Sequence, residues 1–299
     1  MAPPRPRRPT WQRVGLLLPY AWLLLFFLAP FLIVLKISLA DPVVAQPPFT
    51  PLFDAARPPG ERWIATLDNY RFVLGDRLYL LTYLSSTALA ALSTLLCLLL
   101  GYPMAYAIAR SRPARRHALL LLVILPFWTS FLLRVYAWMG ILGTHGPLNR
   151  ALLRAGLVDR PLEILYTNTA VFLGMVYNYL PFMILPLYAT LVRLPQDLLD
   201  AAADLGARPS RVFLDVTLPL SLPGVVAGCL LVFIPAMGEY VIPALLGGPD
   251  NLMIGRVLWD EFFANHDWPV AAAVAIAFLV LLAGPIAVHQ HYRVRQLEH

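Results

Sequence analysis

The sequence has few charged residues for its length. Only 13% of its 299 residues are charged and 59% are apolar, whereas an average soluble domain is about 25% charged and about 45–50% apolar. The mean hydropathy of +0.68 agrees with this imbalance. Charged side chains normally cover the outside of a soluble protein, and here there are too few of them. We therefore expect lipid to surround much of the chain.

Lysine is almost absent, since Lys36 is the only one. A P-loop needs Gly-x4-Gly-Lys-Ser/Thr so that the lysine can reach the phosphates of ATP, and nothing around Lys36 fits this motif. The chain therefore does not hydrolyse ATP through a Walker motif. The formal net charge of +6 comes from arginines scattered among apolar runs. This argues against a nucleic-acid partner, because such a partner requires a grouped basic surface.

Cysteine is also scarce, and no metal or catalytic motif is recognisable. Cys97 and Cys229 lie inside apolar runs without a C-x-x-C pair or a Cys/His cluster, so we interpret them as small buried hydrophobes. The apolar runs hold no Ser/His/Asp set, no H-E-x-x-H motif and no paired catalytic carboxylates, which are the groups that intramembrane catalysis would need. We therefore expect a non-catalytic chain that itself binds no metal or cofactor.

Six apolar stretches are long enough to cross a membrane, because a helix needs about 20 residues to span a hydrocarbon core of about 30 Å. The first stretch competes with a secretory signal, whose apolar region is about 7–15 residues long and ends at a small-residue cleavage site. This stretch is longer and no Ala-x-Ala follows it, so we expect a retained helix. The sequence predicts an all-α membrane protein with six transmembrane helices at residues 14–35, 79–109, 118–142, 169–192, 222–246 and 269–288.

The distribution of arginine predicts that both chain ends face the cytoplasm, because short loops rich in Lys and Arg stay on that side of the membrane. Arginines gather in four segments, namely the tail 1–13, the hinge 110–117, the loop 193–221 and the tail 289–299. The opposite segments hold fewer bases over longer stretches. We therefore expect both chain ends on the cytoplasmic side, a long loop at 36–78 on the opposite side, and five further spans within residues 79–288.

Prolines interrupt the expected spans, and no internal repeat is apparent. A proline inside a helix removes a hydrogen bond and kinks the axis, which is compatible with ordinary membrane packing or with a bundle that moves around a pathway. Because nothing in the chain repeats, we expect a partner chain to supply the second half of any pathway. The prolines in question are Pro103, Pro126, Pro181, Pro186, Pro235, Pro243 and Pro285.

Two charged residues, Arg134 and Glu239, fall inside expected spans. Charges in a bilayer are costly and normally face a cavity or a partner. If both spans are straight helices that rise about 1.5 Å per residue, the two charged residues lie at a similar depth in the membrane. Three roles remain open: an intramembrane ion pair between them, contact of Glu239 with a cationic substrate in the pathway, or snorkelling to the interface. The neighbouring Tyr136, Trp138 and Tyr240 either face a cation through their rings or belong to an interfacial aromatic belt.

The loop 193–221 breaks the apolar pattern most sharply. Proline and acids at its start and glycine near its middle are helix start and stop signals, and they predict a short amphipathic helix from Pro195 to Leu205. A second short helix is expected to follow Pro209 and to end before Pro219. Such a helix–Gly–helix segment is suited to docking a partner, and its alternative is an inert connecting loop.

In this loop the chain resembles the permeases of binding-protein-dependent ABC importers, whose cytoplasmic loop has the pattern E-A-A-x3-G-x9-I-x-L-P. The spacing fits throughout, with Asp in place of Glu and Val in place of Ile. The resemblance implies the fold of a type I ABC importer permease, and a loop that couples a separate ATPase chain to the pathway. It assigns this coupling role to Asp200, Ala201, Ala202, Gly206, Val216, Leu218 and Pro219.

Two further segments resemble polyamine permeases, the runs from Leu125 to Leu142 and from Gly238 to Trp259. The resemblance is closest to the putrescine branch, and it places Tyr136, Trp138, Glu239 and Tyr240 along a substrate pathway. It implies a second homologous permease subunit, a dimer of ATPase subunits that binds ATP and Mg²⁺, and a periplasmic polyamine-binding protein. Spermidine, ferric ion, an oxyanion or an amino acid as substrate remain alternatives, as does an autonomous secondary transporter.

Overall fold

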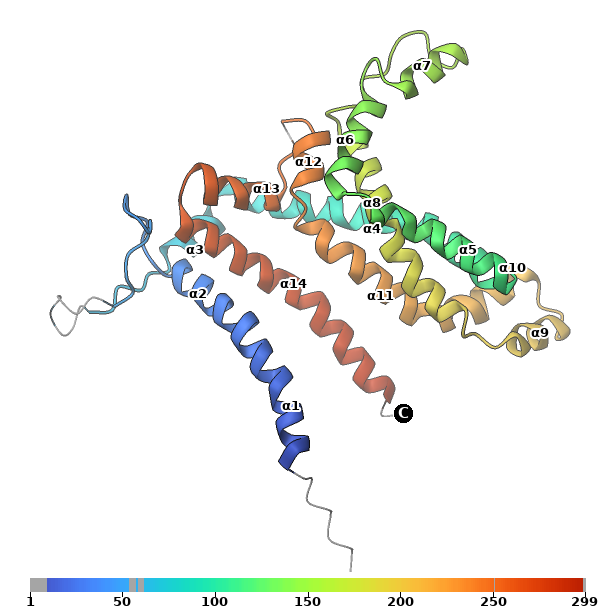
Figure 1. Ribbon diagram of the computed structural model, residues 1–299, viewed down its shortest axis with the longest axis horizontal. Helices are drawn as coiled ribbons and strands as arrows, with labels where there is room; N and C mark the ends of the chain where they lie inside the picture. Colours follow the sequence, from blue (N-terminus) through green and yellow to red (C-terminus); the bar gives the residue numbers. More distant parts are fainter. Residues whose placement is uncertain (1–9, 54–57, 59–61, 250, 298–299) are drawn as a thin grey trace, which may run out of the picture. The chain divides into compact units, whose positions relative to one another are not determined.

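The computed structural model describes residues 10–53, 58, 62–249 and 251–297, and most of the predicted tail 1–13 lies outside these residues. It divides into two compact units, which we describe separately (Figure 1). The terminal unit comprises the described residues up to Arg77 and those from Leu258 onward, and the central unit is Leu78–Val257. The described residues form helices and contain only isolated β-bridges, so the prediction of an all-α fold is confirmed.

The first predicted span lies in a continuous helical segment of the terminal unit. It consists of α1 (Thr10–Leu23), a π-helical turn η1 (Leu24–Leu28) and α2 (Ala29–Ser38). Leu17–Ser38 is long and apolar enough to cross a membrane. The π-turn ends two residues before Pro30, which has no N–H to offer to the regular bonding pattern. The remaining helices of this unit are α3 (Asp68–Gly75), η4 (Asp260–Ala264) and α14 (Trp268–Leu297).

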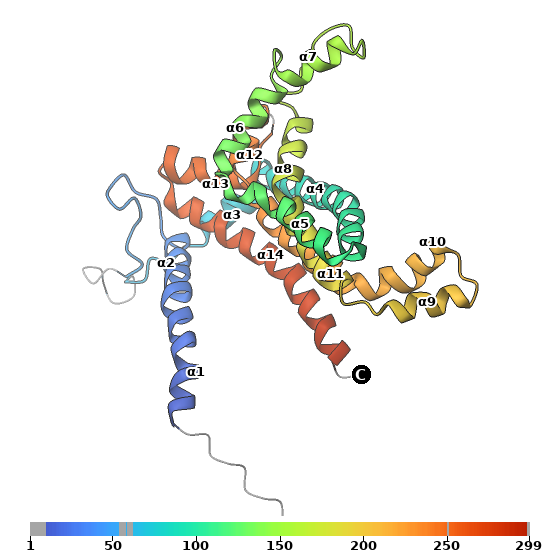
Figure 2. The same cartoon turned by 45° about the vertical axis from the view of Figure 1, so that its right-hand side comes forward.

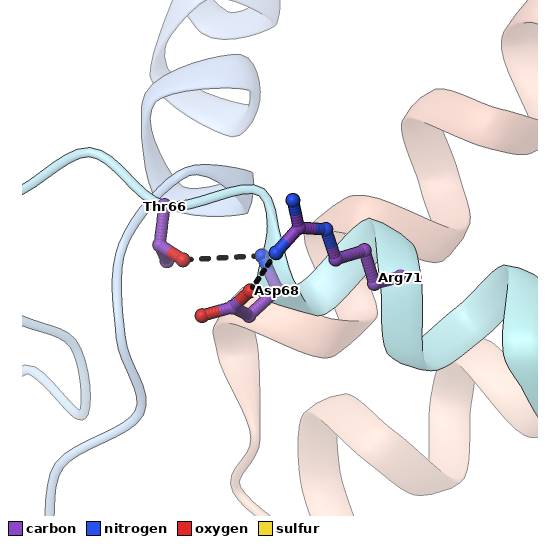
Figure 3. Close-up of polar contacts among 3 residues, drawn as sticks. All are labelled: Thr66, Asp68 and Arg71. Carbon is purple, nitrogen blue, oxygen red and sulfur yellow. Dashed lines mark hydrogen bonds and ion pairs between the residues drawn. The ribbon is translucent and has the colours of Figure 1, made fainter.

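A buried asparagine fixes the end of α2. Asn69 of α3 donates to the carbonyls of Ser38 at 3.0 Å and Ala40 at 2.7 Å, which satisfies carbonyls that a helix end leaves free. The start of α3 is held by contacts between residues close in sequence, shown in Figure 3: the Asp68 N–H donates to Thr66 Oγ1 at 3.1 Å, and Arg71 pairs with Asp68 at 3.2 Å. Because this ion pair is exposed, it contributes little stability. Both α2 and α3 pack on α14.

The central unit contains the other predicted spans. Three of its helices are long and apolar enough to cross a membrane: α4 (Arg77–Arg110), α8 (Asn168–Leu191), and the helical segment Pro209–Met237 that includes α11 (Leu218–Met237). The helices α8 and α11 lie side by side in both views (Figures 1 and 2). They approach closely because Gly224 and Gly228 of α11 face Thr190 and Met183 of α8. The shorter elements are α7 (Pro147–Arg154) and α13 (Ile254–Trp259).

The third predicted span is not one straight helix. It consists of α5 (Pro113–Ile124), a 3₁₀ turn η2 (Leu125–Trp128) and α6 (Phe131–Leu142), and the two halves are bent by 91°. Thr129 and Ser130 between them are extended. The Thr129 hydroxyl donates to the carbonyl of Pro126 at 2.7 Å, so a side chain replaces part of the interrupted helix bonding. The straight helix along which the depth of Arg134 was counted is therefore not present.

The fifth predicted span, 222–246, is also interrupted. The helix α11 ends at Met237, and α12 (Val241–Leu246) follows after Gly238, Glu239 and Tyr240. Pro243 occupies the third position of α12, where a missing N–H removes no helix bond. The sixth predicted span lies in α14, whose described apolar part, Trp268–Gly284, is shorter than the other spans.

The contact between α8 and α11 generates a test. A Cβ atom added at Gly224 would lie 2.8 Å from Cβ of Thr190 and 3.0 Å from the carbonyl oxygen of Pro186. We expect Gly224→Ala to lower the free energy of unfolding by about 1–3 kcal/mol, because overpacking forces the backbones apart. Thermal unfolding of the purified protein measures this. Gly140→Ala is the matched control, since nothing lies within 4 Å of the added atom; equal melting temperatures for the two variants would contradict the prediction.

Candidate functional site

The first candidate region is the hairpin that follows α8. It is built from α9 (Gln196–Asp204), a turn at Gly206, α10 (Pro209–Val212) and a π-helical turn η3 (Phe213–Thr217). Figures 1 and 2 both show α9 and α10 together at one end of the central unit, away from α7. The predicted helix from Pro195 to Leu205 is confirmed. The second helix does not end before Pro219 as expected, because η3 carries the chain into α11 with Pro219 in its first turn.

The spacing of Ala202 and Gly206 has a structural cause. The N–H of Ala207 donates to the carbonyl of Ala202 at 3.1 Å, and the N–H of Gly206 donates to that of Ala203 at 2.8 Å. These two bonds make a Schellman cap, which requires a left-handed residue after the helix end. Gly206 has φ +82° and supplies it. Part of the sequence motif therefore encodes the turn of the hairpin.

The other motif residues lie on both arms of the hairpin. Asp200 and Ala201 are exposed on α9, Val216 is half-buried in η3, and Leu218 and Pro219 begin α11. The apolar face predicted for α9 is only partly covered, because Leu199 is buried whereas Leu198 and Leu205 are 48% and 89% exposed. The hairpin thus presents apolar side chains at its surface.

The second candidate region is the break between α11 and α12, where Glu239 is buried. One carboxylate oxygen, Oε1, accepts from the N–H groups of Tyr240 at 3.1 Å, Val241 at 3.0 Å and Ile242 at 3.4 Å. The other, Oε2, accepts from the hydroxyl of Tyr179 on α8. Glu239 therefore caps the start of α12 and fastens it to α8. A negative charge at a helix N-terminus is also favourable for the helix dipole.

The structure does not bring Arg134 and Glu239 together as an ion pair. The guanidinium of Arg134 lies over the rings of Phe127, at 5.4 Å, and Phe131, at 5.8 Å. Its Nε and Nη1 atoms are buried without a hydrogen-bond partner in the described residues. Cation–π attraction at this distance compensates part of the cost of burial.

The predicted aromatic residues lie on α6, which packs on α12, and at the break itself. Helix α12 packs on α6 and α8. On α6, Tyr136 is 53% exposed, and the ring of Trp138 meets Tyr177 of α8 edge to face at 5.5 Å. Tyr240 immediately precedes α12. Sequence reasoning missed Tyr179, because nothing in the pattern of α8 links this residue to a carboxylate in another span.

Comparison with known proteins identifies the family. The family described as "Binding-protein-dependent transport system inner membrane component" matches residues 97–293. The chain belongs to this family. It is a permease of an ABC importer, a multi-pass inner-membrane subunit that is not itself an enzyme.

Individual relatives cover most of the chain. It is 38% identical to the spermidine/putrescine transport system permease protein PotB of Haemophilus influenzae over 96% of this chain and 95% of that protein. It is 44% identical to PotB of Escherichia coli over 74% of this chain and 80% of that protein. Among solved structures, a bacterial alginate ABC transporter in complex with alginate pentasaccharide-bound periplasmic protein has a similar fold, with a TM-score of 0.71 at 17% identity, covering 95% of this chain and 94% of that one.

The geometry of Glu239 predicts a graded loss of stability. We expect Glu239→Ala to lower the free energy of unfolding by several kcal/mol, since each buried N–H left without an acceptor costs about 1–3 kcal/mol. Glu239→Gln keeps an oxygen for the three N–H groups and should cost less. Tyr179→Phe is the control that removes only the hydroxyl. Thermal unfolding of the purified importer measures the series, and equal losses for the Ala and Gln variants would rule out capping as the source.

Proposed function

We propose that this permease carries polyamines of the spermidine and putrescine class into the cell. The similarity to spermidine/putrescine permeases over nearly the whole chain carries the proposal. Transport runs by alternating access, in which nucleotide binding and release shift the population between outward-open and inward-open states. Putrescine, to which the sequence motifs are closest, is one of the transported substrates.

We further propose the assembly in which the chain works. It pairs with a second, homologous permease subunit, receives substrate from a periplasmic polyamine-binding protein, and is driven by two copies of an ATPase that hold ATP and Mg²⁺. The chain itself binds no cofactor. Its ends and the loop 193–221 face the cytoplasm and residues 36–78 face the periplasm, an orientation supported by the distribution of arginine in the sequence.

The hairpin is proposed as the surface that docks on the ATPase. Support comes from its compact helix–turn–helix form, from the exposed Leu198 and Leu205, and from the exposed motif residues Asp200 and Ala201. Apolar side chains at an exposed tip are typical of a surface that a partner covers. Movement of the ATPase is thereby passed to α8 and α11, which the hairpin joins.

The pathway is proposed to pass the break before α12. Tyr136 and Trp138 of α6, with Tyr240, offer rings to a polycation. The Glu239 carboxylate shapes the break and lowers the local electrostatic potential, although its oxygens are already engaged with Tyr179 and backbone N–H groups. Arg134 is proposed to stay turned onto its two phenylalanine rings and out of the path of the cation.

Uptake competition tests the substrate. In proteoliposomes that contain the full importer with its binding protein, we expect excess unlabelled putrescine and spermidine each to suppress uptake of labelled putrescine. Ferric ion, molybdate and amino acids, at the same excess, should leave it unchanged. Failure of both polyamines to compete would overturn the polyamine assignment, and the ratio of their effects ranks the two substrates.

Substitution at the hairpin turn tests docking. Gly206 has open space around its Cβ position, so Gly206→Glu places a charged side chain at the tip. Glutamate at this positive φ also costs about 1–2 kcal/mol. We expect this variant to abolish ATP-driven uptake and to lose ATPase subunits during purification. Gly206→Asn is the matched control, because asparagine tolerates the left-handed conformation. Normal uptake by the Glu variant would remove the docking assignment.

A further inference from the structure

A polar chain of contacts runs from the end of α4 to the motif of the hairpin. Arg110 is the last residue of α4, and its Nη1 donates to Oε1 of Gln196, the first residue of α9. The amide Nε2 of Gln196 in turn donates to Oδ1 of Asp200 at 3.1 Å. The carboxylate that opens the sequence motif is therefore oriented by a side chain that a membrane-spanning helix holds.

Aromatic contacts fix the other arm of the hairpin to the same helix. The Arg110 guanidinium lies 5.5 Å from the ring centre of Tyr106. The rings of Tyr106 and Tyr102 meet Phe213 of η3 edge to face, at 6.4 Å and 5.4 Å. The hydroxyl of Tyr102 also lies 2.8 Å from that of Ser221 on α11. The end of α4 thus contacts α9, η3 and α11, which are both arms of the hairpin and the span that follows it.

The contact at Arg110 has room to change. A cavity of about 260 Å³ lies among α4, α9 and η3, and Tyr106, Arg110, Gln196 and Phe213 are among its lining residues. The Nη2 atom of Arg110 is buried and has no hydrogen-bond partner in the described residues. An arginine has five N–H donors in a rigid plane, so this side chain has both a spare donor and adjacent space. A packed element with two discrete arrangements can carry coupling between distant sites.

We propose that Arg110 is the positioning residue that transmits movement of the hairpin to α4. It does so by holding Gln196, and through it Asp200, while it stacks on Tyr106. Lysine could donate to Gln196 but has no planar group to stack on the ring at the same time. The inference rests on the proposed docking of the hairpin on an ATPase, and it adds α4 to α8 and α11 as a span that the hairpin drives.

The test measures ATP hydrolysis and polyamine uptake together in proteoliposomes that contain the whole importer and its loaded binding protein. With Arg110→Gln, we expect uptake to fall by about tenfold, the scale of one lost hydrogen bond to a charged group. ATP hydrolysis should fall less, so that more ATP is consumed per polyamine transported. Arg110→Lys should lie between this variant and the unmodified importer.

Two further variants separate transmission from general damage. Gln196→Leu should raise the ATP consumed per polyamine as Arg110→Gln does, and the double variant should be no worse than either, because both remove the same contact. Arg112→Gln is the matched control, since Arg112 is exposed and its side chain takes part in none of these contacts. It should leave both rates unchanged.

The outcomes that overturn the proposal are distinct. An unchanged ratio of hydrolysis to uptake in Arg110→Gln, or additive effects in the double variant, would show that Arg110 transmits nothing through Gln196. Loss of ATPase subunits from the purified Arg110→Gln complex would show that it only holds the docking surface in shape. Failure of the docking proposal itself is separately visible, because Gly206→Glu would then keep normal uptake and its ATPase subunits.

Discussion

A break in a membrane helix leaves N–H and C=O groups that lipid cannot bond, and the central unit depends on how Glu239 meets this constraint. Its carboxylate accepts from three consecutive N–H groups at the start of α12 and from the hydroxyl of Tyr179 on α8. Pro243, next in line, has no N–H to satisfy. One buried charge therefore replaces the hydrogen bonds that a continuous helix would have made, and it sets the position of α12 against its neighbours.

This arrangement explains why an acidic residue such as Glu239 can lie inside a span without contacting the transported substrate. Burying a carboxylate is costly unless its oxygens are bonded, and four donors converge on Glu239. Arg134 shows a different solution, with its guanidinium over Phe127 and Phe131. Because Glu239 is satisfied by its own donors and Arg134 is partly compensated by its two rings, the helices that carry them do not depend on a mutual ion pair.

The sequence predicted the all-α fold and the place and apolar character of the helices, since these follow from composition and length. Of the six predicted spans, four are helices long and apolar enough to cross a membrane, one is a bent pair of helices, and the described apolar part of the last is shorter. The sequence could not predict that residues 118–142 bend by 91° or that 222–246 is interrupted. Prolines were visible in both stretches, but a proline in a membrane helix can produce anything from a mild kink to a full break. A full break forms where other groups can bond the backbone atoms that the break leaves free. The Thr129 hydroxyl does this in residues 118–142, and Glu239 with Tyr179 does it in residues 222–246. The contact of Tyr179 with Glu239 joins segments far apart in the chain, and such a contact leaves no periodic pattern in a single sequence.

The hairpin motif, in contrast, was recognisable in the sequence, because contacts between residues close in the chain impose its spacing. A Schellman cap fixes the interval between the last carbonyls of a helix and the left-handed residue that follows it, and Ala202 and Gly206 stand at that interval. Asp200 and Ala201 are exposed on the preceding turns, so the motif combines residues that shape the turn with residues that can meet a partner. Arg110 and Gln196 lie outside the motif. Any pair of polar residues at the end of α4 and the start of α9 could link these two helices, so only the folded structure shows that this pair does.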